Sequence, residues 1–351
     1  TTYHSPGQSG GLSLGCTAMV IHGSSKIAGI GIYLPEERIS SISLMEEIQS
    51  EKRFGIPLDW VDRRIGIVER RFADSRTQPS DLATEASIVA LQKAGIDPKH
   101  LDLIIYCGIE KDFMEPGTAH VIQKKLFSNA VCMDVSNACQ GVISGMTVAD
   151  SLIATGSIET ALICSGERAS RVVRQFIHRI NNEPDEYFRD RFGVMTVGDA
   201  GSAVVLSRSE KTRPSGIKAM QFNSKGEYAE LCFYRYGDHG IEGQMLMKGI
   251  TDTINEIHTD MMSETYRDLE WQPEDVDHMI CHQVGKKSVS DFCSISNVPL
   301  EKTPLTYIYL GNTASCSIPI ALDFANPKEG DKMLMMGGGS GLASFQGGVI
   351  W

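Results

Sequence analysis

The sequence predicts an α/β protein built from two copies of one folding unit, and three observations carry that prediction. Short apolar segments alternate with segments of helical periodicity, the pattern of a sheet with helices on both faces. The segment at 97–107 resembles the segment at 272–282, which lies 175 residues further on. The same offset relates SNACQGVISG to GNTASCSIPI, and ALICSGE resembles MLMMGGG at a slightly smaller offset. Two matches at one offset indicate a duplication.

The duplication divides the chain into three parts. Residues 1–24 are rich in Gly and Ser, and we expect a flexible N-terminal arm there. Residues 25–213 are expected to form the first half, which carries Cys139. Residues 214–351 are expected to form the second half, which carries His282 and Asn312.

The elements of the first half follow from local patterns. A proline ends a first strand at 26–35, and Pro79 with Ser80 begins a helix that continues to residue 94. Further strands are expected at 101–108, 131–136, 159–167 and 202–208, with helices at 118–127 and 139–156. Strands that alternate with helices at these lengths predict a parallel sheet.

Composition excludes several classes of protein. The 42% hydrophobic and 22% charged residues are typical of a globular protein, and the net charge of −11 argues against nucleic-acid binding. The nine cysteines are scattered without a CxxC pair, which argues against a disulfide framework and a zinc site. No secretory signal or membrane span is recognisable. We therefore expect a cytoplasmic protein that binds no metal.

Cys139 lies in the stretch around which the rest of the sequence is organised. A short apolar strand, VCMDVS, precedes it, and a helix rich in small residues follows. At a helix N-terminus, unpaired N–H groups and the helix dipole favour the thiolate, which is the reactive form of cysteine. The pattern therefore indicates a nucleophile, although a structural core cysteine fits the same stretch.

The duplication strengthens the interpretation of His282 and Asn312 as site residues. His282 ends a buried strand, and Asn312 lies in the turn of the second half that matches the turn of Cys139. A core histidine and a turn asparagine are the structural alternatives. If the halves are related by an approximate twofold, the three side chains converge on one site. They then supply a nucleophile, a proton carrier and a hydrogen-bond donor, as acyl transfer requires.

A set of motifs resembles one enzyme family. From Lys26 onward the chain resembles the β-ketoacyl-acyl-carrier-protein synthase III group of the thiolase superfamily. The motifs that carry the resemblance are GIGIYLPE, WVDRRIGIVERR, SNACQG, GDAGSAVVL, HQVGKK, YLGNTASCSIPIAL and the final GGG. None of these motifs is sufficient alone, but together they are specific.

The resemblance implies a thiolase fold in five layers (α/β/α/β/α), a homodimer and a triad of Cys139, His282 and Asn312. It implies an acyltransferase that joins a Cys-bound acyl group to a second acyl thioester by Claisen condensation, in fatty-acid, polyketide or related secondary metabolism. The substrates are thioesters of coenzyme A or acyl carrier protein, and no cofactor is expected. Backbone N–H groups of Cys139 and Gly338 are expected to stabilise the oxyanion, although the three glycines also fit a tight turn.

The same resemblance assigns the entrance for coenzyme A or the carrier protein. Trp60 and Arg64 correspond to the residues that bracket the adenine of coenzyme A, and Arg191 to a further arginine on that side. Lys286 and Lys287 follow His282 and are expected to meet phosphate or an acidic carrier protein. An ordinary solvated face is the alternative for each cation.

Two departures from the family pattern point to a specialised enzyme. HQVGKK has Gly285 where the family has an asparagine, and Glu115 replaces an aromatic residue on a loop that reaches the partner subunit's acyl tunnel. A carboxylate in an apolar tunnel is expected to have a raised pKa and to serve as a general base. Relatives that join two long acyl chains without decarboxylation, the olefin-pathway and α-pyrone synthases, carry a glutamate at about this place, so the chain resembles that subgroup. The alternative is that Glu115 faces solvent or pairs with Lys111.

Three classes of function stay open from the sequence. The first is a condensing enzyme, with Glu115 as base or with a malonyl donor that loses carbon dioxide. The second transfers the acyl group from Cys139 to an oxygen or nitrogen nucleophile without forming a carbon–carbon bond. The third is a non-catalytic subunit that binds carrier protein, which the complete triad disfavours.

Overall fold

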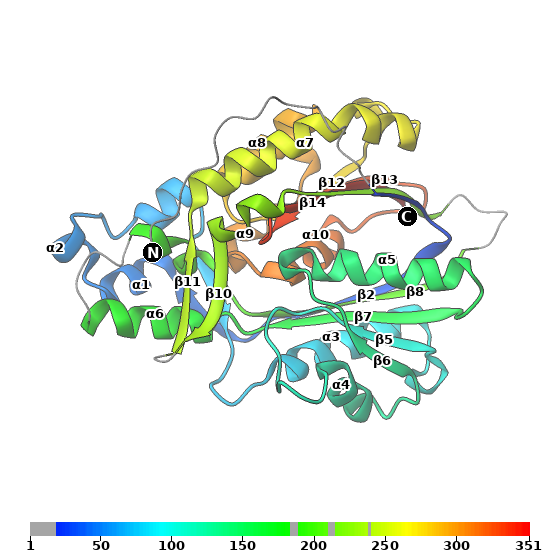
Figure 1. The fold of residues 1–351 in the computed structure, drawn as a ribbon, viewed down its shortest axis with the longest axis horizontal. Helices are drawn as coiled ribbons and strands as arrows, with labels where there is room; N and C mark the ends of the chain where they lie inside the picture. The colour runs from blue at the N-terminus through cyan, green and yellow to red at the C-terminus, as the bar shows by residue number, and fades with distance from the viewer. Residues whose placement is uncertain (1–18, 183–188, 210–214, 238–239) are drawn as a thin grey trace.

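A computed structural model describes residues 19–182, 189–209, 215–237 and 240–351 of the chain (Figure 1). Two five-stranded sheets form the centre of this part, and two small two-stranded sheets lie beside them. The two large sheets correspond to the two halves expected from the sequence, with one exception at the N-terminus.

The first sheet is built from the first half of the chain. Its order is β2 (Ser25–Tyr33), β8 (Ala200–Arg208), β7 (Thr160–Glu167), β5 (Leu103–Tyr106) and β6 (Val131–Asp134). β5 runs parallel to β6 and β7, whereas β8 runs antiparallel to β7 and β2. Alternate residues of these strands pack on opposite faces, one covered by α3 (Pro79–Ala94) and α4 (Thr118–Leu126) and the other by α5 (Gly141–Ala154).

The second sheet repeats this plan. Its order is β1 (Met19–His22), β9 (Gly216–Ser224), β14 (Ala343–Ile350), β13 (Lys332–Gly339) and β12 (His278–Cys281). Only β12 and β13 run parallel; the other pairs in this sheet are antiparallel. α7 (Met247–Leu269) and α8 (Lys286–Ser296) cover the outer face, and α10 (Ser317–Ala325) covers the inner face.

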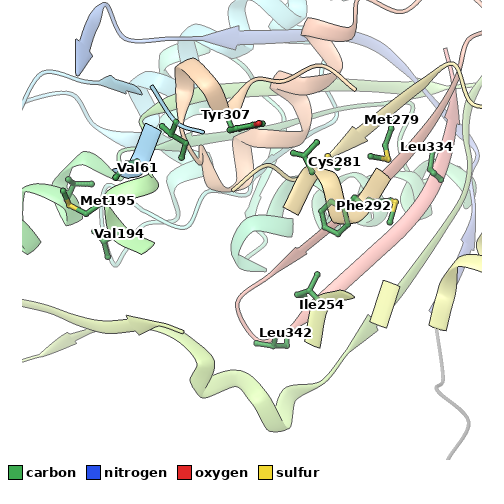
Figure 2. Close-up of a cluster of buried hydrophobic side chains, with 14 of the residues drawn as sticks. Val61, Val194, Met195, Ile254, Met279, Cys281, Phe292, Tyr307, Leu334 and Leu342 are labelled. Atoms are coloured by element: carbon green, nitrogen blue, oxygen red, sulfur yellow. The ribbon is translucent and has the colours of Figure 1, made fainter. Parts of the chain in front are cut away.

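The resulting order of layers is α3 and α4, first sheet, α5 and α10, second sheet, α7 and α8 (Figure 1). The five-layered fold implied by the resemblance is therefore confirmed. The outer layer of the second half is held by a cluster of buried side chains that includes Ile254 of α7, Phe292 of α8 and Leu334 of β13 (Figure 2). Because this cluster continues to Val194 and Met195, it also joins the second half to the first.

The remaining elements surround the ends of the sheets. The strands are β3 (Glu37–Ser40), β4 (Glu69–Phe72), β10 (Cys232–Gly237) and β11 (Gly240–Met245). The α-helices are α1 (Ser41–Glu47), α2 (Ser50–Phe54), α6 (Ser170–Asn182) and α9 (Tyr307–Leu310). The short helices are η1 (Val61–Ile65), η2 (Pro98–His100), η3 (Ala138–Gln140), η5 (Arg189–Thr196), η6 (Gly226–Leu231), η7 (Pro273–Asp275), η8 (Leu300–Lys302) and η9 (Ala314–Cys316). No helix in the described ranges is long and apolar enough to cross a membrane.

Two expectations about the sheets are wrong. The sheets are mixed rather than parallel, because several strands do not return through a helix on one face; β13 and β14, for example, are joined only by residues 340–342. The flexible arm is expected to include residues 1–24, and this boundary lies too far along the chain. Met19–His22 forms β1, which pairs with β9 of the second sheet. Residues 1–18 lie outside the described residues.

The duplication is visible in the structure, but the offset between the two turns is 176 residues rather than 175. β5 and β12 are offset by 175 residues, and β7 and β13 by 172. The short helices η3 and η9 are offset by 176, and their first residues, Ala138 and Ala314, both have positive φ values, 45° and 48°. The structural counterpart of Cys139 is therefore Ser315, rather than Ala314 as the sequence offset of 175 gives.

We predict that Gly145 is required for the packing of α5 against the first sheet. A Cβ atom at this position would lie 2.5 Å from Cys107 Sγ and 2.9 Å from Ile163 Cγ2. Gly145→Ala should therefore lower the free energy of unfolding by about 1–3 kcal/mol, as measured by denaturant titration. Ser151→Ala, on the exposed side of the same helix, is the control and should change it by less than ~0.5 kcal/mol. Equal stability of the two variants would contradict the close packing.

Candidate active site

One cavity, with a volume of about 680 Å³, lies where the ends of the two sheets meet. Its wall includes the four residues expected at the catalytic centre: Cys139, His282, Asn312 and Gly338. Most of the remaining wall is apolar, including Val172, Val194, Val197, Phe233, Met245, Met247, Ile250, Ile254 and Phe292. The cavity therefore combines a small polar centre with a long apolar surface.

Cys139 lies at the middle of η3, between β6 and α5. The turn is tight, because the preceding Ala138 adopts a left-handed conformation. The backbone N–H of Gln140 donates to the carbonyl of Asn137, and the Asn137 side-chain amide donates to Ser144 Oγ at 2.9 Å. These bonds fix the turn that presents Cys139 to the cavity.

The protonation state of Cys139 differs from the sequence-based expectation. Burial raises the pKa of its thiol above the ordinary value, and the neighbouring Cys232 and Glu167 raise it further. The favourable effect of the helix N-terminus is outweighed because α5 begins only at Gly141 and the thiol faces a largely apolar wall. The resting group is a thiol, so the reaction needs a base that removes its proton.

His282 is the group in the cavity suited to that task. It follows the last residue of β12, and its backbone N–H donates to the carbonyl of Met336 at 2.9 Å. Burial lowers the pKa of the imidazole to about 4, so the ring is neutral at pH 7. A neutral imidazole has one nitrogen that accepts a proton and one that donates a hydrogen bond.

Asn312 is fixed at the start of the turn that contains η9. Its backbone N–H donates to the carbonyl of Thr196 at 2.8 Å, and its carbonyl accepts from Gly198 N–H at 3.0 Å. Its side-chain Oδ1 accepts from the backbone N–H of Ala314 at 2.9 Å. Because the oxygen is used in this way, the NH₂ group of the amide is the part available for hydrogen bonding to a substrate oxygen.

The glycines at the end of β13 allow the two halves to approach closely. A Cβ atom on Gly339 would lie 3.2 Å from Cys139 N, and one on Gly337 would lie 3.1 Å from His282 Cβ. Gly338, expected to supply an oxyanion-stabilising N–H, lines the cavity between these two contacts. The strand end therefore brings its backbone next to both the cysteine and the histidine.

Of the residues expected at the entrance, Trp60, Arg64, Lys286 and Lys287 do not line the cavity. Trp60 packs edge-on against Phe192, the residue after Arg191, with ring centroids 4.8 Å apart. Arg64, in η1, is exposed, and η1 lies against the start of α8, where Lys286 is also exposed. Lys287 pairs with Asp291 at 2.7 Å. The backbone of Arg191 belongs to η5, and its side chain lies outside the described residues.

Glu115 does not reach the cavity of its own chain. It is exposed on the loop that joins β5 to α4, beside Phe113 and Met114, whose exposures are 55% and 96%. Lys111 pairs with Asp134 at 3.4 Å rather than with Glu115. Gly285, the other departure from the family pattern, has a φ of 150° and lies against Ile65 of η1, where a side chain would collide.

Sequence reasoning missed several polar residues in the cavity wall, and three of them lie near the proposed catalytic residues or influence their charge. They are Glu110, Glu167 and Cys232. Burial raises the pKa of both carboxyl groups to about 7. A glutamate after the apolar run ALICSG was visible in the sequence, but nothing local indicated that it faces a turn of the other half.

Within the described ranges, no group of three or more His, Cys, Asp and Glu side chains is arranged to hold a metal ion.

Comparison with known proteins agrees with this geometry. Residues 133–226 match the 3-oxoacyl-[acyl-carrier-protein] synthase III family, and residues 267–350 match the C-terminal part of the same synthase. The fold is similar to OleA of Xanthomonas campestris. A cerulenin-bound structure of that protein has 27% identity and a TM-score of 0.86, over 94% of this chain and 98% of that chain. A cysteine-to-serine variant with bound lauric acid and lauroyl-CoA has 26% identity and a TM-score of 0.86, over 94% and 100%.

Proposed function

The chain belongs to the 3-oxoacyl-[acyl-carrier-protein] synthase III group of condensing enzymes in the thiolase superfamily, and we propose that Cys139, His282 and Asn312 carry out its reaction. Enzymes of this group are acyltransferases that form a carbon–carbon bond by Claisen condensation of acyl thioesters. The proposal rests on one observation: residues from both halves, 139, 282 and 312, lie in the wall of one cavity.

In the first step, the enzyme takes up an acyl group. The neutral imidazole of His282 accepts the proton of the Cys139 thiol, and the sulfur attacks the carbonyl carbon of the first thioester. The backbone N–H groups of Cys139 and Gly338 stabilise the oxyanion that forms. The tetrahedral intermediate then expels the substrate thiolate, which takes up a proton and leaves as the free thiol. The acyl group stays on Cys139 as a new thioester.

In the second step, a carbon–carbon bond forms. A base removes a proton from the α-carbon of the second acyl thioester, and His282 and Asn312 donate hydrogen bonds to the enolate oxygen. The α-carbon attacks the acyl carbonyl on Cys139, and collapse of the intermediate expels the cysteine sulfur. The product is a β-ketoacyl thioester.

The apolar wall supports acyl chains of some length as substrates. Nine of the lining side chains named above are apolar, and the OleA variant that resembles this chain binds lauroyl-CoA. Exposed cations on two elements in contact, Arg64 of η1 and Lys286 of α8, support a phosphate-bearing carrier such as coenzyme A or acyl carrier protein. All eight cysteines in the described part are free thiols, which supports a reducing, cytoplasmic compartment.

A homodimer would give Glu115 a role as the base. In one chain, Glu115 is exposed among apolar neighbours, and Phe113 and Met114 would be costly to leave in water. Strand β6 is at the edge of the first sheet, and its Val131 is 66% exposed. A second copy of the chain placed along this edge would cover these side chains and bring Glu115 towards the partner's cavity. Glu115 would then remove the α-proton in that subunit.

Incubation with an acyl-CoA should leave a covalent acyl group on Cys139, because this thiol lies in the same cavity wall as His282 and Gly338. Intact-mass spectrometry should show the adduct in the wild type and its loss in Cys139→Ala. Cys132→Ala, which alters a partly buried thiol on β6, is the control and should keep the adduct. An adduct that persists in Cys139→Ala would rule out the nucleophile.

His282→Ala and Asn312→Ala should reduce condensation about 10²–10³-fold while acylation of Cys139 stays measurable. Both side chains stabilise the enolate, which forms only in the second step. Acylation should also slow in His282→Ala, which removes the base for the Cys139 thiol, but not in Asn312→Ala. Product mass spectrometry on enzyme already loaded with an acyl group separates the two steps. His278→Ala, at the other end of β12 and paired with Asp331 at 3.1 Å, is the matched control. Loss of acylation alone, with condensation intact, would contradict these roles.

Glu115→Gln should acylate Cys139 but fail to condense two simple acyl thioesters, because it keeps the shape of the side chain and removes its basicity. Glu85→Gln, exposed on α3, is the control and should condense normally. Mixing Glu115→Gln subunits with Cys139→Ala subunits should restore part of the activity, since one site of each mixed dimer has both residues.

Three results would exclude Glu115 as the base. The first is condensation by the Gln variant at the wild-type rate. The second is a wild type that accepts only malonyl donors and releases carbon dioxide, because the donor would then supply the carbanion. The third is a monomer by light scattering, since Glu115 lies outside the cavity of its own chain.

A further inference from the structure

Glu167 is a buried carboxylate in the cavity wall that the proposed mechanism does not use. It is the last residue of β7, and only 2% of it is exposed. Burial of a carboxylate is unfavourable unless it accepts hydrogen bonds. The donors that it meets therefore indicate what the residue does.

The donors to Glu167 come from two separate segments. The Oε1 atom accepts from the backbone N–H of Ile109 at 3.1 Å and from the hydroxyl of Ser315. Backbone N–H groups of Glu110 and Ser315 lie near enough to lower the pKa of the carboxyl group. Ser165, two residues earlier on β7, lies 2.5 Å from Ser315 through their Oγ atoms. The end of β7 thus binds Ser315 at two points.

Each segment leads directly to a residue of the condensation step. Ile109 and Glu110 begin the loop that carries Glu115. Ser315 belongs to η9, and the turn before it is closed by the hydrogen bond from Ala314 N–H to Asn312 Oδ1 at 2.9 Å. The Glu167 carboxylate therefore links the loop that carries Glu115, the proposed base, to the turn that carries Asn312.

The duplication relates the contact between Glu167 and Ser315 to the contact between Gly339 and Cys139. With the offsets of 172 for β7 and β13 and 176 for η3 and η9, Glu167 is the counterpart of Gly339, and Ser315 is the counterpart of Cys139. The strand end of the second half approaches the proposed nucleophile of the first half closely through a glycine. The strand end of the first half and the turn of the second half, at the matching positions, are joined by a hydrogen bond between a carboxylate and a serine.

We propose that Glu167 is a positioning residue for condensation, whose carboxylate holds the loop 109–116 and the Asn312 turn in a fixed relation. The inference rests on the proposed function, because it assumes that Glu115 and Asn312 act on the same α-carbon and its thioester. Glu167 touches neither reacting group; it acts through Ile109, Glu110 and Ser315.

The charge of Glu167 changes near neutral pH. Burial raises its pKa to about 7 against the hydrogen bonds, which lower it. Above that pH the ionised carboxylate accepts from all its donors; below it the carboxyl is protonated, and one oxygen becomes a donor. Condensation should therefore fall as the pH is lowered through about 7, whereas His282 stays neutral over this range because its pKa is about 4.

Several other ionisable groups lie near Glu167 and could contribute to the pH dependence. Glu110 also has a pKa of about 7, and its Oε2 lies 3.8 Å from Arg171 of α6. Asp199, with a pKa of about 6, and Arg168 act on Glu110 at longer range. The Cys139 thiol is neutral here, because burial raises its pKa. A Glu110→Gln variant separates the contribution of Glu110 from that of Glu167.

The experiment compares Glu167→Gln with the wild type in three measurements. These are acylation of Cys139 by intact mass, condensation on preloaded enzyme by product mass, and the pH profile of condensation between about pH 6 and pH 8. The Gln variant should acylate Cys139 as the wild type does and condense about 10²-fold more slowly. Its condensation rate should no longer fall as the pH is lowered through about 7. In Glu110→Gln that fall in rate should remain.

Two further variants keep the test informative. Ser315→Ala removes one donor without removing the carboxylate, and should reduce condensation but not acylation, even if Glu167→Gln does not fold. Glu159→Gln is the control: its carboxylate, 64% exposed, pairs with Arg208 at 2.7 Å just before β7, and its loss should change neither step.

The outcomes separate this inference from the proposed function. A wild type that forms no adduct on Cys139 or no condensed product refutes the proposed function, and the inference with it. A wild type that condenses, together with a Glu167→Gln variant of equal rate and equal pH profile, refutes the inference alone. Equal losses of acylation and condensation in Glu167→Gln and Ser315→Ala would also overturn it, since they would indicate a general structural role.

Discussion

The close approach of two chain segments from opposite halves is the constraint on which the site depends. The end of β13 comes so near to the Cys139 turn that a side chain at Gly339 would lie 3.2 Å from the backbone nitrogen of the cysteine. The same need for small residues extends into α5, where Gly141 and Gly145 lie against Cys107. Because these contacts leave no room for a Cβ atom, the two sheets meet closely enough for His282 and Cys139 to share one cavity.

Desolvation determines the charge state of that cavity. Burial keeps Cys139 as a thiol and His282 as a neutral imidazole, and it raises the pKa of Glu110 and Glu167 to about 7. A site with little charge suits an apolar acyl chain, because no ion has to be desolvated when the chain enters. In the proposed mechanism, the charge needed for reaction appears only when the thiol proton moves to the imidazole, next to the backbone donors proposed for the oxyanion.

The two halves show how one backbone arrangement has come to serve two purposes. Both contain a tight turn with a left-handed alanine, Ala138 or Ala314, placed against the end of a strand. In the first half the residue after the alanine is Cys139, which faces the cavity. In the second half it is Ser315, which is bound to the Glu167 carboxylate. The geometry that exposes a nucleophile in one copy supports a fixed contact between segments in the other.

The sequence by itself determined the features that depend on local pattern: the repeat of β5 in β12, the cysteine after a short strand, and the histidine and asparagine in the matching half. A buried strand and a tight turn leave a periodic signal in consecutive residues, and duplication lets one copy support the interpretation of the other. Only the tertiary structure decided the direction of β8 and β14, the pairing of Met19–His22 with β9, and the contact between Glu167 and Ser315, which are 148 residues apart. The physical reason is that such pairings gain their free energy from residues distant in sequence, and no local pattern records which distant partner a strand edge or a buried carboxylate will meet.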